Sequence, residues 1–215
     1  MTDENGREFE NRAEDLSKNS EVVRVLKKIE KTKSLFEHLV ADLPSFEVTS
    51  AEALPYGLKP HTRSVSWLVE QVIVQRLRAQ REVLQIDSVD YDLPDTELHD
   101  VELLVGQSPL YVNIKCHQAE KKQNKNDISA VVKLYQRYMD NPDYDLLYAS
   151  IGIRFEGRFI RFLPEHIACF SPQFLPLYVN PTNDKIQAFY NHQPVLRTRE
   201  VFLTELKTAS KTLKL

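Results

Sequence analysis

Apolar residues recur every three or four positions in four segments of the chain, a spacing typical of amphipathic helices. The first segment covers residues 21–42 and is followed by Pro44. The second covers residues 64–80. A third begins with Asn126 or Asp127 as its N-cap and ends before Pro142, and a fourth covers residues 198–212. In the second segment the predicted buried stripe consists of Trp67, Leu68, Val72, Ile73 and Leu77.

Between these helices the apolar period shortens towards two, which indicates strands. Strands are predicted over residues 83–86, 101–105, 110–116, 146–155 and 158–162. Residues 43–60 form a proline-containing connection, and residues 171–194 contain loops and short strands. The order of elements predicts an α/β or α+β domain, in which helices flank a mixed central sheet. We expect residues 1–20, which are polar, to be loosely ordered, and residues 21–215 to form a single domain with an N-terminal helical arm.

Composition and charge narrow the function classes. Hydrophobic residues make up 42% and charged residues 27% of the chain, as in globular proteins. No apolar run is long enough to span a bilayer or to act as a secretory signal, so we expect a cytoplasmic protein without membrane contact. The formal net charge of −3 argues against a non-specific DNA coat, although basic clusters occur locally. The two cysteines, Cys116 and Cys169, and the scattered histidines His61, His99 and His117 lack the spacing of metal ligands.

The strands at residues 101–105 and 110–116 form the clearest hairpin of the chain, and alternation sorts its side chains onto two faces. One face is entirely apolar; it consists of Val101, Leu103, Val105, Leu110, Val112, Ile114 and Cys116. The other face is mostly polar; it consists of Asp100, Glu102, Leu104, Tyr111, Asn113, Lys115 and His117. If residues 106–109 form the turn, Glu102 lies opposite Asn113 and Asp100 lies opposite Lys115.

Acids, an amide and a lysine on one patch are suited to phosphodiester hydrolysis. Carboxylate and amide oxygens can hold Mg²⁺ at a scissile phosphate. A neighbouring lysine can orient the attacking water or stabilise charge on the phosphate. The alternative is an ordinary half-exposed hairpin whose charges serve solubility.

The motif Asp100, then Asn113-Ile114-Lys115, resembles the PD-(D/E)xK nuclease superfamily. The local sequence LYVNIK, residues 110–115, resembles that of type II restriction endonucleases in particular. The resemblance covers about residues 64–155. The resemblance implies a restriction-endonuclease-like fold, Mg²⁺, catalytic roles for Asp100, Asn113 and Lys115, and a contribution from Glu70 on the preceding helix. The family's second acid is replaced by Asn113. Its carboxylate can come instead from Glu102, Asp127 or Glu120; otherwise Asn113 itself serves with Glu70, or the site is inactive.

Residues 171–199 form a candidate DNA-contact region, because the polar side chains there can read base edges and phosphates. The residues predicted to contact DNA are Lys121, Lys122, Lys125, Asn183, Lys185, Arg197 and Arg199. Solvated loops of the same composition are the alternative interpretation.

The leading hypothesis is a homodimeric type II restriction endonuclease that cuts double-stranded DNA and works with a cognate methyltransferase. The alternatives are a repair or recombination nuclease of the same fold, and a non-catalytic DNA-binding relative. The helix at residues 21–42 is a candidate dimer interface, with core packing as its alternative.

Overall fold

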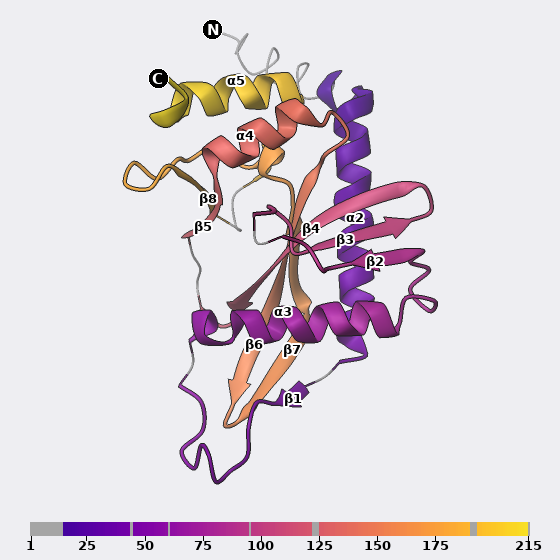
Figure 1. Cartoon of the computed structure of the whole chain (residues 1–215), viewed down its shortest axis with the longest axis vertical. Coiled ribbons are helices and arrows are strands. Elements are labelled where there is room, and N and C mark those ends of the chain that lie inside the picture. The colour runs from indigo at the N-terminus through magenta and orange to yellow at the C-terminus, as the bar shows by residue number, and fades with distance from the viewer. Residues whose placement is uncertain are drawn as a thin grey trace, which may run out of the picture. The chain divides into compact units, whose positions relative to one another are not determined.

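The computed structural model describes residues 15–43, 45–59, 61–94, 96–121, 125–189 and 193–214. The chain divides into two compact units (Figure 1). The sheet unit comprises Glu30–Lys122 and Leu146–Phe170, and the terminal unit comprises Met1–Ile29, Gln123–Asp145 and Ser171–Leu215. The interpretation of residues 21–215 as one nuclease domain stays a prediction, and most of the predicted loose N-terminus lies outside the described residues.

The sheet unit is built on a curled, six-stranded mixed sheet with the order β1-β7-β6-β4-β3-β2. Its strands are β1 Ser45–Glu47, β2 Ser88–Asp90, β3 Val101–Val105, β4 Ser108–Gln118, β6 Leu146–Glu156 and β7 Phe159–Phe170. Strands β4 and β6 pair in parallel, whereas the other neighbours are antiparallel. Helix α3, Thr62–Ala79, packs against β4, and the later turns of α2, Ser20–Ala41, also belong to this unit. The predicted α/β architecture, a mixed sheet flanked by helices, is confirmed.

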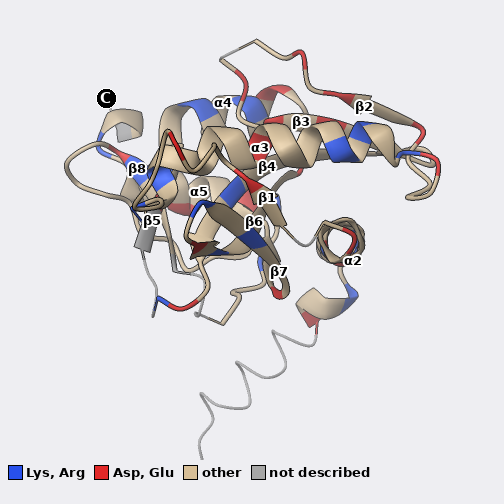
Figure 2. Ribbon diagram, turned by 90° about the horizontal axis from the view of Figure 1, so that it is seen from below, with Lys and Arg blue, Asp and Glu red and all other residues tan. Residues whose placement is uncertain are grey.

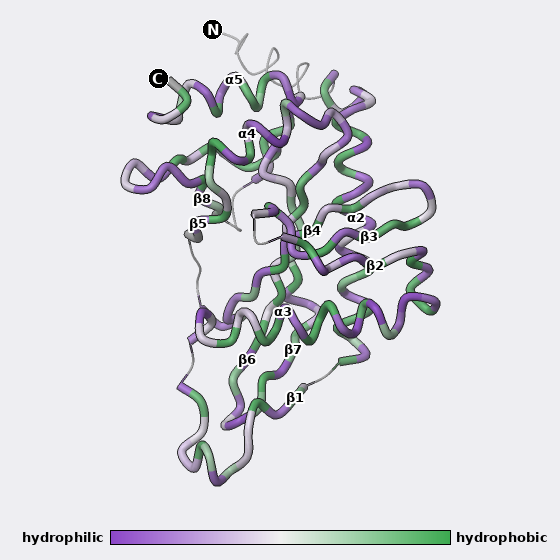
Figure 3. The backbone as a smooth tube through the Cα atoms, in the orientation of Figure 1, coloured by the Kyte–Doolittle hydropathy of each residue, from purple (hydrophilic) through white to green (hydrophobic). Residues whose placement is uncertain are grey.

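The core of the sheet unit forms where apolar strand faces meet apolar helix faces. Strand β6 lies inside the sheet, and all of its residues from Leu146 to Ile153 are buried. On α3, hydrophobic and hydrophilic stretches alternate along the helix (Figure 3). Its buried residues are Val65, Val69, Ile73, Val74 and Leu77. The prediction that Trp67 is buried was wrong: it is 70% exposed, because the row one helical turn apart from Val65 through Val69 to Ile73 faces the core instead.

Three sequence-based boundaries change in the structure. Residues 83–86 form turns rather than a strand, and the strand begins at Ser88. The connection at residues 43–60 contains the short strand β1, which pairs with β7. Residues 125–130 form strand β5 rather than the start of a helix, because they pair with β8, a partner distant in sequence that local capping signals do not reveal.

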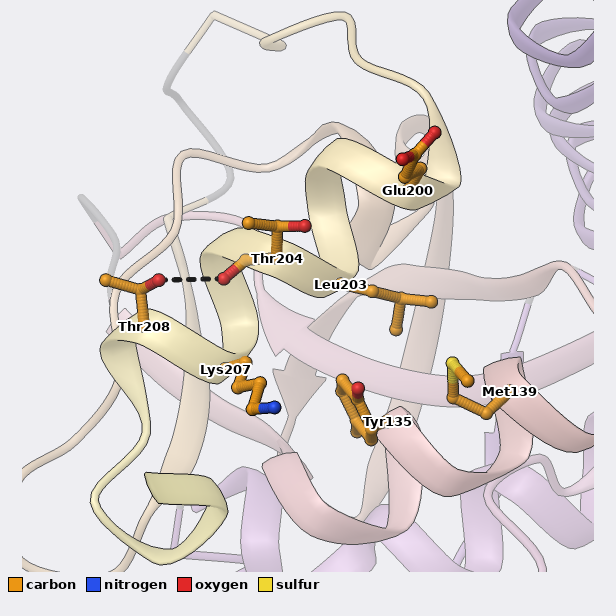
Figure 4. A pocket seen from close by; sticks show the side chains of 7 residues that line it. All are labelled: Tyr135, Met139, Glu200, Leu203, Thr204, Lys207 and Thr208. Carbon is orange, nitrogen blue, oxygen red and sulfur yellow. Dashed lines mark hydrogen bonds between the residues drawn. The ribbon is translucent and has the colours of Figure 1, made fainter.

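The described part of the terminal unit contains a two-stranded sheet and several helices. Its elements, beside the first turns of α2, are β5 Lys125–Ala130, α4 Val131–Asp140, η1 Pro172–Phe174, β8 Lys185–Phe189, α5 Arg199–Ala209 and η2 Thr212–Lys214. A shallow pocket with a volume of about 570 Å³ lies between Tyr135 and Met139 of α4 and Leu203 and Lys207 of α5 (Figure 4). Across the described part of the chain, no helix combines the length and hydropathy needed to cross a membrane.

Candidate active site

The β3–β4 hairpin turns tightly at Gly106 and Gln107, so Val105 pairs with Ser108. Gly106 has a φ of 65°, which glycine adopts without the steric cost of a Cβ atom. The predicted four-residue turn was therefore wrong, and Glu102 lies opposite Tyr111 instead of Asn113. The register differs by two residues, which keeps every side chain on its predicted face. The apolar face from Val101 to Ile114 is buried as predicted.

Asp100 directly precedes β3, and its carboxylate is held by the neighbouring strand. Its backbone N–H donates to Val112 O at 3.0 Å, which extends the ladder by one residue. Its Oδ2 accepts a hydrogen bond from Ile114 N at 2.7 Å, and Lys115 Nζ lies 3.9 Å from the same oxygen. The structure therefore brings Asp100 and Lys115 together, although Asp100 is not directly opposite Lys115 in the ladder.

Glu70 lies on α3 within electrostatic range of these two residues. Partial burial raises the pKa of its carboxyl, the charge of Asp100 raises it further, and Lys115 lowers it. Burial likewise raises the pKa of Asp100, against the lowering effects of Lys115 and of the hydrogen bond from Ile114 N. The predicted helix acid thus belongs to the same cluster, in which two carboxylates repel each other across one lysine.

Asn113 occupies the position of the missing acid and is 8% exposed. Its Nδ2 donates to Leu98 O at 2.9 Å and to Asp100 Oδ1 at 3.2 Å. These two donations orient the amide, because a carbonyl oxygen accepts and does not donate. The buried Oδ1 of Asn113 then has no hydrogen-bond partner among the described residues. An amide oxygen in this state can coordinate a cation or accept a hydrogen bond from water.

The three relocated acids considered above have other surroundings. Burial raises the pKa of Glu102, and the charges of Asp90 and Glu97 raise it further, so Glu102 belongs to an acidic group next to β2. Glu120 pairs with Arg154. Asp127, in the terminal unit, accepts hydrogen bonds from the side chains of Asn180, Asn183 and Gln187, which together lower its pKa. The role of Glu102, Glu120 or Asp127 as the relocated acid stays a prediction.

His117 and Ser150 form a polar pair beside Lys115 that the sequence indicated only in part. His117 shares the polar face of β4, and its Nδ1 lies 2.8 Å from Ser150 Oγ on β6. Lys115 pairs with Ser150 in the parallel ladder. Burial and the nearby His166 lower the pKa of His117. Ser150 gave no signal in the sequence, because its contact depends on which strand lies beside β4.

The predicted DNA-contact residues have mixed positions. Lys121, Asn183 and Lys185 are exposed, and Asn183 Nδ2 donates to Asp127 Oδ2 at 2.7 Å. Lys122 lies outside the described residues, and Lys125 is described only as a backbone position of β5.

Arg197 and Arg199 have internal partners within the terminal unit. Arg197 is 4% exposed, pairs with Glu205 at 2.8 Å and donates to Leu175 O. Arg199 donates to three backbone carbonyls, those of Tyr138, Asn141 and Tyr144, and to Asp145. These guanidinium groups hold the unit together, and their interpretation as phosphate contacts stays a prediction.

The cluster of Asp100, Glu70 and Asn113 offers only a few oxygen atoms that could bind a metal ion. Within the described ranges, no group of three or more His, Cys, Asp or Glu side chains is arranged to hold a metal ion. The cluster does offer the carboxylates of Asp100 and Glu70 and the unpartnered Oδ1 of Asn113. An all-oxygen set of this size fits Mg²⁺, which retains several waters and takes its remaining ligands from substrate phosphate.

Comparisons with known proteins agree with the architecture. No protein-family model matches the chain, and no curated protein sequence matches it. Among solved structures it is similar to the NlaIV restriction endonuclease, with a TM-score of 0.54 and 14% sequence identity. The match covers 73% of this chain and 69% of that chain. The protein therefore has a restriction-endonuclease-like fold.

Proposed function

We propose that this protein is a Mg²⁺-dependent endonuclease that hydrolyses phosphodiester bonds of double-stranded DNA. The observation that carries the proposal is the contact between Asp100 and Lys115, with Oδ2 and Nζ 3.9 Å apart, next to Glu70. These residues were selected from a motif in the sequence, and they converge in a fold similar to that of a restriction endonuclease. The sequence motif supports the choice of these residues, and the structural similarity supports the fold that holds them.

Asp100, with Asn113 and Glu70, would hold the metal ion in this proposal. Bound there, Mg²⁺ supplies a Lewis acid that polarises the scissile phosphate and lowers the pKa of the attacking water. Burial raises the pKa of Asp100 and that of Glu70, and a divalent cation held between them would offset the cost of their buried negative charge. The Oδ1 of Asn113 adds a neutral oxygen to this set.

Lys115 acts on the substrate side of the site. Its side chain is 37% exposed, so the ammonium group is open to solvent while it remains near Asp100. An ammonium at this position orients the attacking water and stabilises the negative charge that develops on the phosphate. Asp100, fixed by Ile114 N, keeps its orientation during this step.

The finer proposal is a type II restriction endonuclease. It would act as a homodimer on a symmetric DNA site, each subunit would cut one strand, and a cognate methyltransferase would protect the host site. A repair or recombination nuclease on the same fold is the second candidate, because the polar hairpin serves either substrate.

Incubation of the full chain with mixed plasmid DNA and Mg²⁺ tests the proposal. We expect discrete fragments that disappear with chelator and with Asp100→Ala. Nicking of branched DNA without discrete fragments would favour the repair nuclease. No cleavage of either substrate, with DNA binding retained, would contradict an enzymatic role.

A further inference from the structure

Helix α3 carries an exposed aromatic residue on a polar strip next to the candidate active site. The strip consists of Arg63, Trp67 and Gln71, which recur every four residues and therefore lie on one side of the helix. Trp67 is 70% exposed and Arg63 is exposed, whereas Gln71 is half-buried. A large aromatic residue in this position is unusual, since tryptophan is mostly buried in folded proteins.

The strip adjoins the cluster around Asp100. Glu70 follows Trp67 by three residues, so the two side chains are neighbours on the helix surface. Glu70 is in turn coupled electrostatically to Asp100 and Lys115. At the start of α3, Thr62 O lies 3.9 Å from Sγ of Cys116, the residue after Lys115. The electrostatic coupling of Glu70 and the contact of Thr62 both indicate that the N-terminal half of α3 lies alongside β4, the strand that contains Lys115.

The charge of the helix favours an anionic partner. Helix α3 contains three arginines and one glutamate, and basic residues stand out along it in Figure 2. Arg78 stacks over the ring of Tyr91 at 5.6 Å and donates to its hydroxyl at 3.0 Å. Arg78 is thus engaged with Tyr91 near the C-terminal end of α3. Arg63 is the second residue of the helix, so it supplies positive charge at the end that is close to Cys116 and Lys115.

The polar surroundings of Trp67 also favour nucleic acid over a protein partner. A protein-docking face usually presents several apolar side chains together, whereas the members of this strip adjacent to Trp67 are an arginine and a glutamine. An isolated aromatic ring beside a cation matches DNA, whose sugars and base edges offer apolar surface between phosphates.

We propose that the strip binds the DNA duplex that flanks the scissile phosphate. Arg63 contacts a phosphate, and Trp67 packs against sugar and base edges. This inference rests on the proposed endonuclease function. Because aromatic contacts of this kind contribute substantially to DNA affinity, loss of the ring weakens binding by at least about fivefold.

Trp67 is the sole tryptophan of the chain, so fluorescence excited selectively at tryptophan, and not at the nine tyrosines, reports on this position alone. We would titrate the full-length protein with a short mixed-sequence DNA duplex, with chelator present to prevent cleavage. We expect the duplex to quench Trp67 and to protect it from acrylamide. Binding of a labelled duplex is measured in parallel for Trp67→Ala, Trp67→Phe and Arg63→Ala.

Arg161→Ala is the matched control for loss of one positive charge, because Arg161 is an exposed residue of β7 paired with Glu156. We expect Trp67→Ala and Arg63→Ala to bind at least about fivefold more weakly than Arg161→Ala, and Trp67→Phe to retain most of the affinity. Circular dichroism shows whether each variant is folded. If Trp67→Ala is not, Arg63→Ala and the quenching of Trp67 in the wild type still test the strip.

The outcomes separate this inference from the proposed function. If the wild type binds and cuts DNA while folded Trp67→Ala and Arg63→Ala bind as tightly as Arg161→Ala and the fluorescence of Trp67 does not respond, the strip is not a DNA contact. The nuclease proposal stands in that case. If the wild type neither binds nor cuts DNA, the proposed function itself fails. Quenching that depends on protein concentration without DNA would assign the strip to a second copy of the chain and overturn the inference.

Discussion

Oδ2 of Asp100 lies 3.9 Å from Nζ of Lys115. The same oxygen accepts a hydrogen bond from Ile114 N at 2.7 Å. Despite both contacts the pKa of Asp100 is raised, because the cost of burying the carboxylate exceeds their favourable effects. An ion pair whose favourable contacts do not offset the cost of burying its charges contributes little to stability, and such pairs are typical of functional sites.

The first prediction concerns the two residues of this contact. Asp100→Ala and Lys115→Ala should each reduce DNA cleavage by about 100-fold or more, because they remove the proposed metal ligand and the group proposed to stabilise charge on the phosphate. The measurement is the single-turnover cleavage rate of plasmid DNA with saturating Mg²⁺. Duplex binding with chelator serves as the control and should change little. Cleavage at the wild-type rate by either variant would remove the basis of the proposed site.

The second prediction identifies the carboxylate that accompanies Asp100. Glu70→Ala should reduce cleavage about as severely as Asp100→Ala, because Glu70 is the acid coupled to Asp100 and Lys115. Glu102→Ala and Glu120→Ala should retain activity, since Glu102 faces Asp90 and Glu97, and Glu120 pairs with Arg154. Cleavage rates of the three variants, measured side by side, decide the question. Severe loss with Glu102→Ala and full activity with Glu70→Ala would reverse the assignment.

The third prediction uses the raised pKa of Glu70. A carboxyl whose pKa is raised by folding binds its proton more tightly in the folded state, so it costs stability once the pH rises above that pKa. Below the ordinary value of 4.5 the group is protonated in both states, and the cost disappears. Glu70→Gln should therefore raise Tm relative to wild type at about pH 7 and much less at about pH 4.

The measurement is the Tm of both proteins over this pH range in the presence of chelator. Glu52→Gln, at an exposed position, is the control and should shift Tm equally little throughout. A difference for Glu70→Gln that shrinks towards neutral pH would show that the carboxylate is stabilised rather than strained by its surroundings.

The fourth prediction concerns Asp145 in the terminal unit, whose side chain is fully buried. It accepts from Lys28 at 2.8 Å, and from Arg24 and Arg199 at 3.1 Å each. Asp145→Ala leaves these cations without their shared anion and should lower the free energy of unfolding by about 3–5 kcal/mol. Asp143 is the matched control: it pairs with Arg24 at 3.4 Å but is 83% exposed, so Asp143→Ala should cost less than about 1 kcal/mol. Urea unfolding measures both, and equal costs would contradict a structural role of the buried cluster.

The spacing of apolar residues was sufficient to predict much of the fold, because this spacing reflects which side of a helix or strand is buried. The helices at residues 21–42 and 64–80 and the faces of the β3–β4 hairpin were predicted from spacing. The faces remained correct although the register was wrong by two residues, since alternation has a period of two. Asp100 and Lys115 could therefore be assigned to one surface without knowledge of the turn.

Features that depend on distant partners could not be predicted in this way. Asp127 was interpreted as an N-cap and a metal ligand, whereas the amides of Asn180, Asn183 and Gln187 surround its carboxylate. Arg199 was interpreted as a phosphate contact, and the sequence did not indicate that the backbone carbonyls of Tyr138 and Tyr144 accept hydrogen bonds from its guanidinium group. The spacing of apolar residues shows that a polar residue lies outside the buried face of a helix or strand. It does not show which hydrogen-bond partner, distant in sequence, that residue contacts.

The last prediction is the charge substitution Asn113→Asp. From the motif alone an added carboxylate would preserve or raise activity, because the resembling family carries an acid there. The structure predicts otherwise at low Mg²⁺. Asn113 Nδ2 donates to Leu98 O and to Asp100 Oδ1, and an ionised carboxylate can replace neither donation. Two acceptors left facing a carboxylate cost about 1–3 kcal/mol, and the pKa of the introduced carboxyl and that of Asp100 rise together.

A divalent cation would relieve this repulsion, since hard ions favour anionic oxygens. We therefore expect Asn113→Asp to have a lower Tm than wild type in chelator, to gain more Tm from Mg²⁺ than wild type does, and to need more Mg²⁺ for half-maximal cleavage. Asn141→Asp is the control, because Oδ1 of Asn141 accepts a hydrogen bond from Asp143 N that a carboxylate can also accept, and Asn141 is in the other unit. Thermal melts and cleavage rates across a Mg²⁺ titration test the prediction. Faster cleavage than wild type at low Mg²⁺ would mean that the site needs a further acid besides Asp100 and Glu70. An unchanged Mg²⁺ response in both assays would place Asn113 outside the metal site.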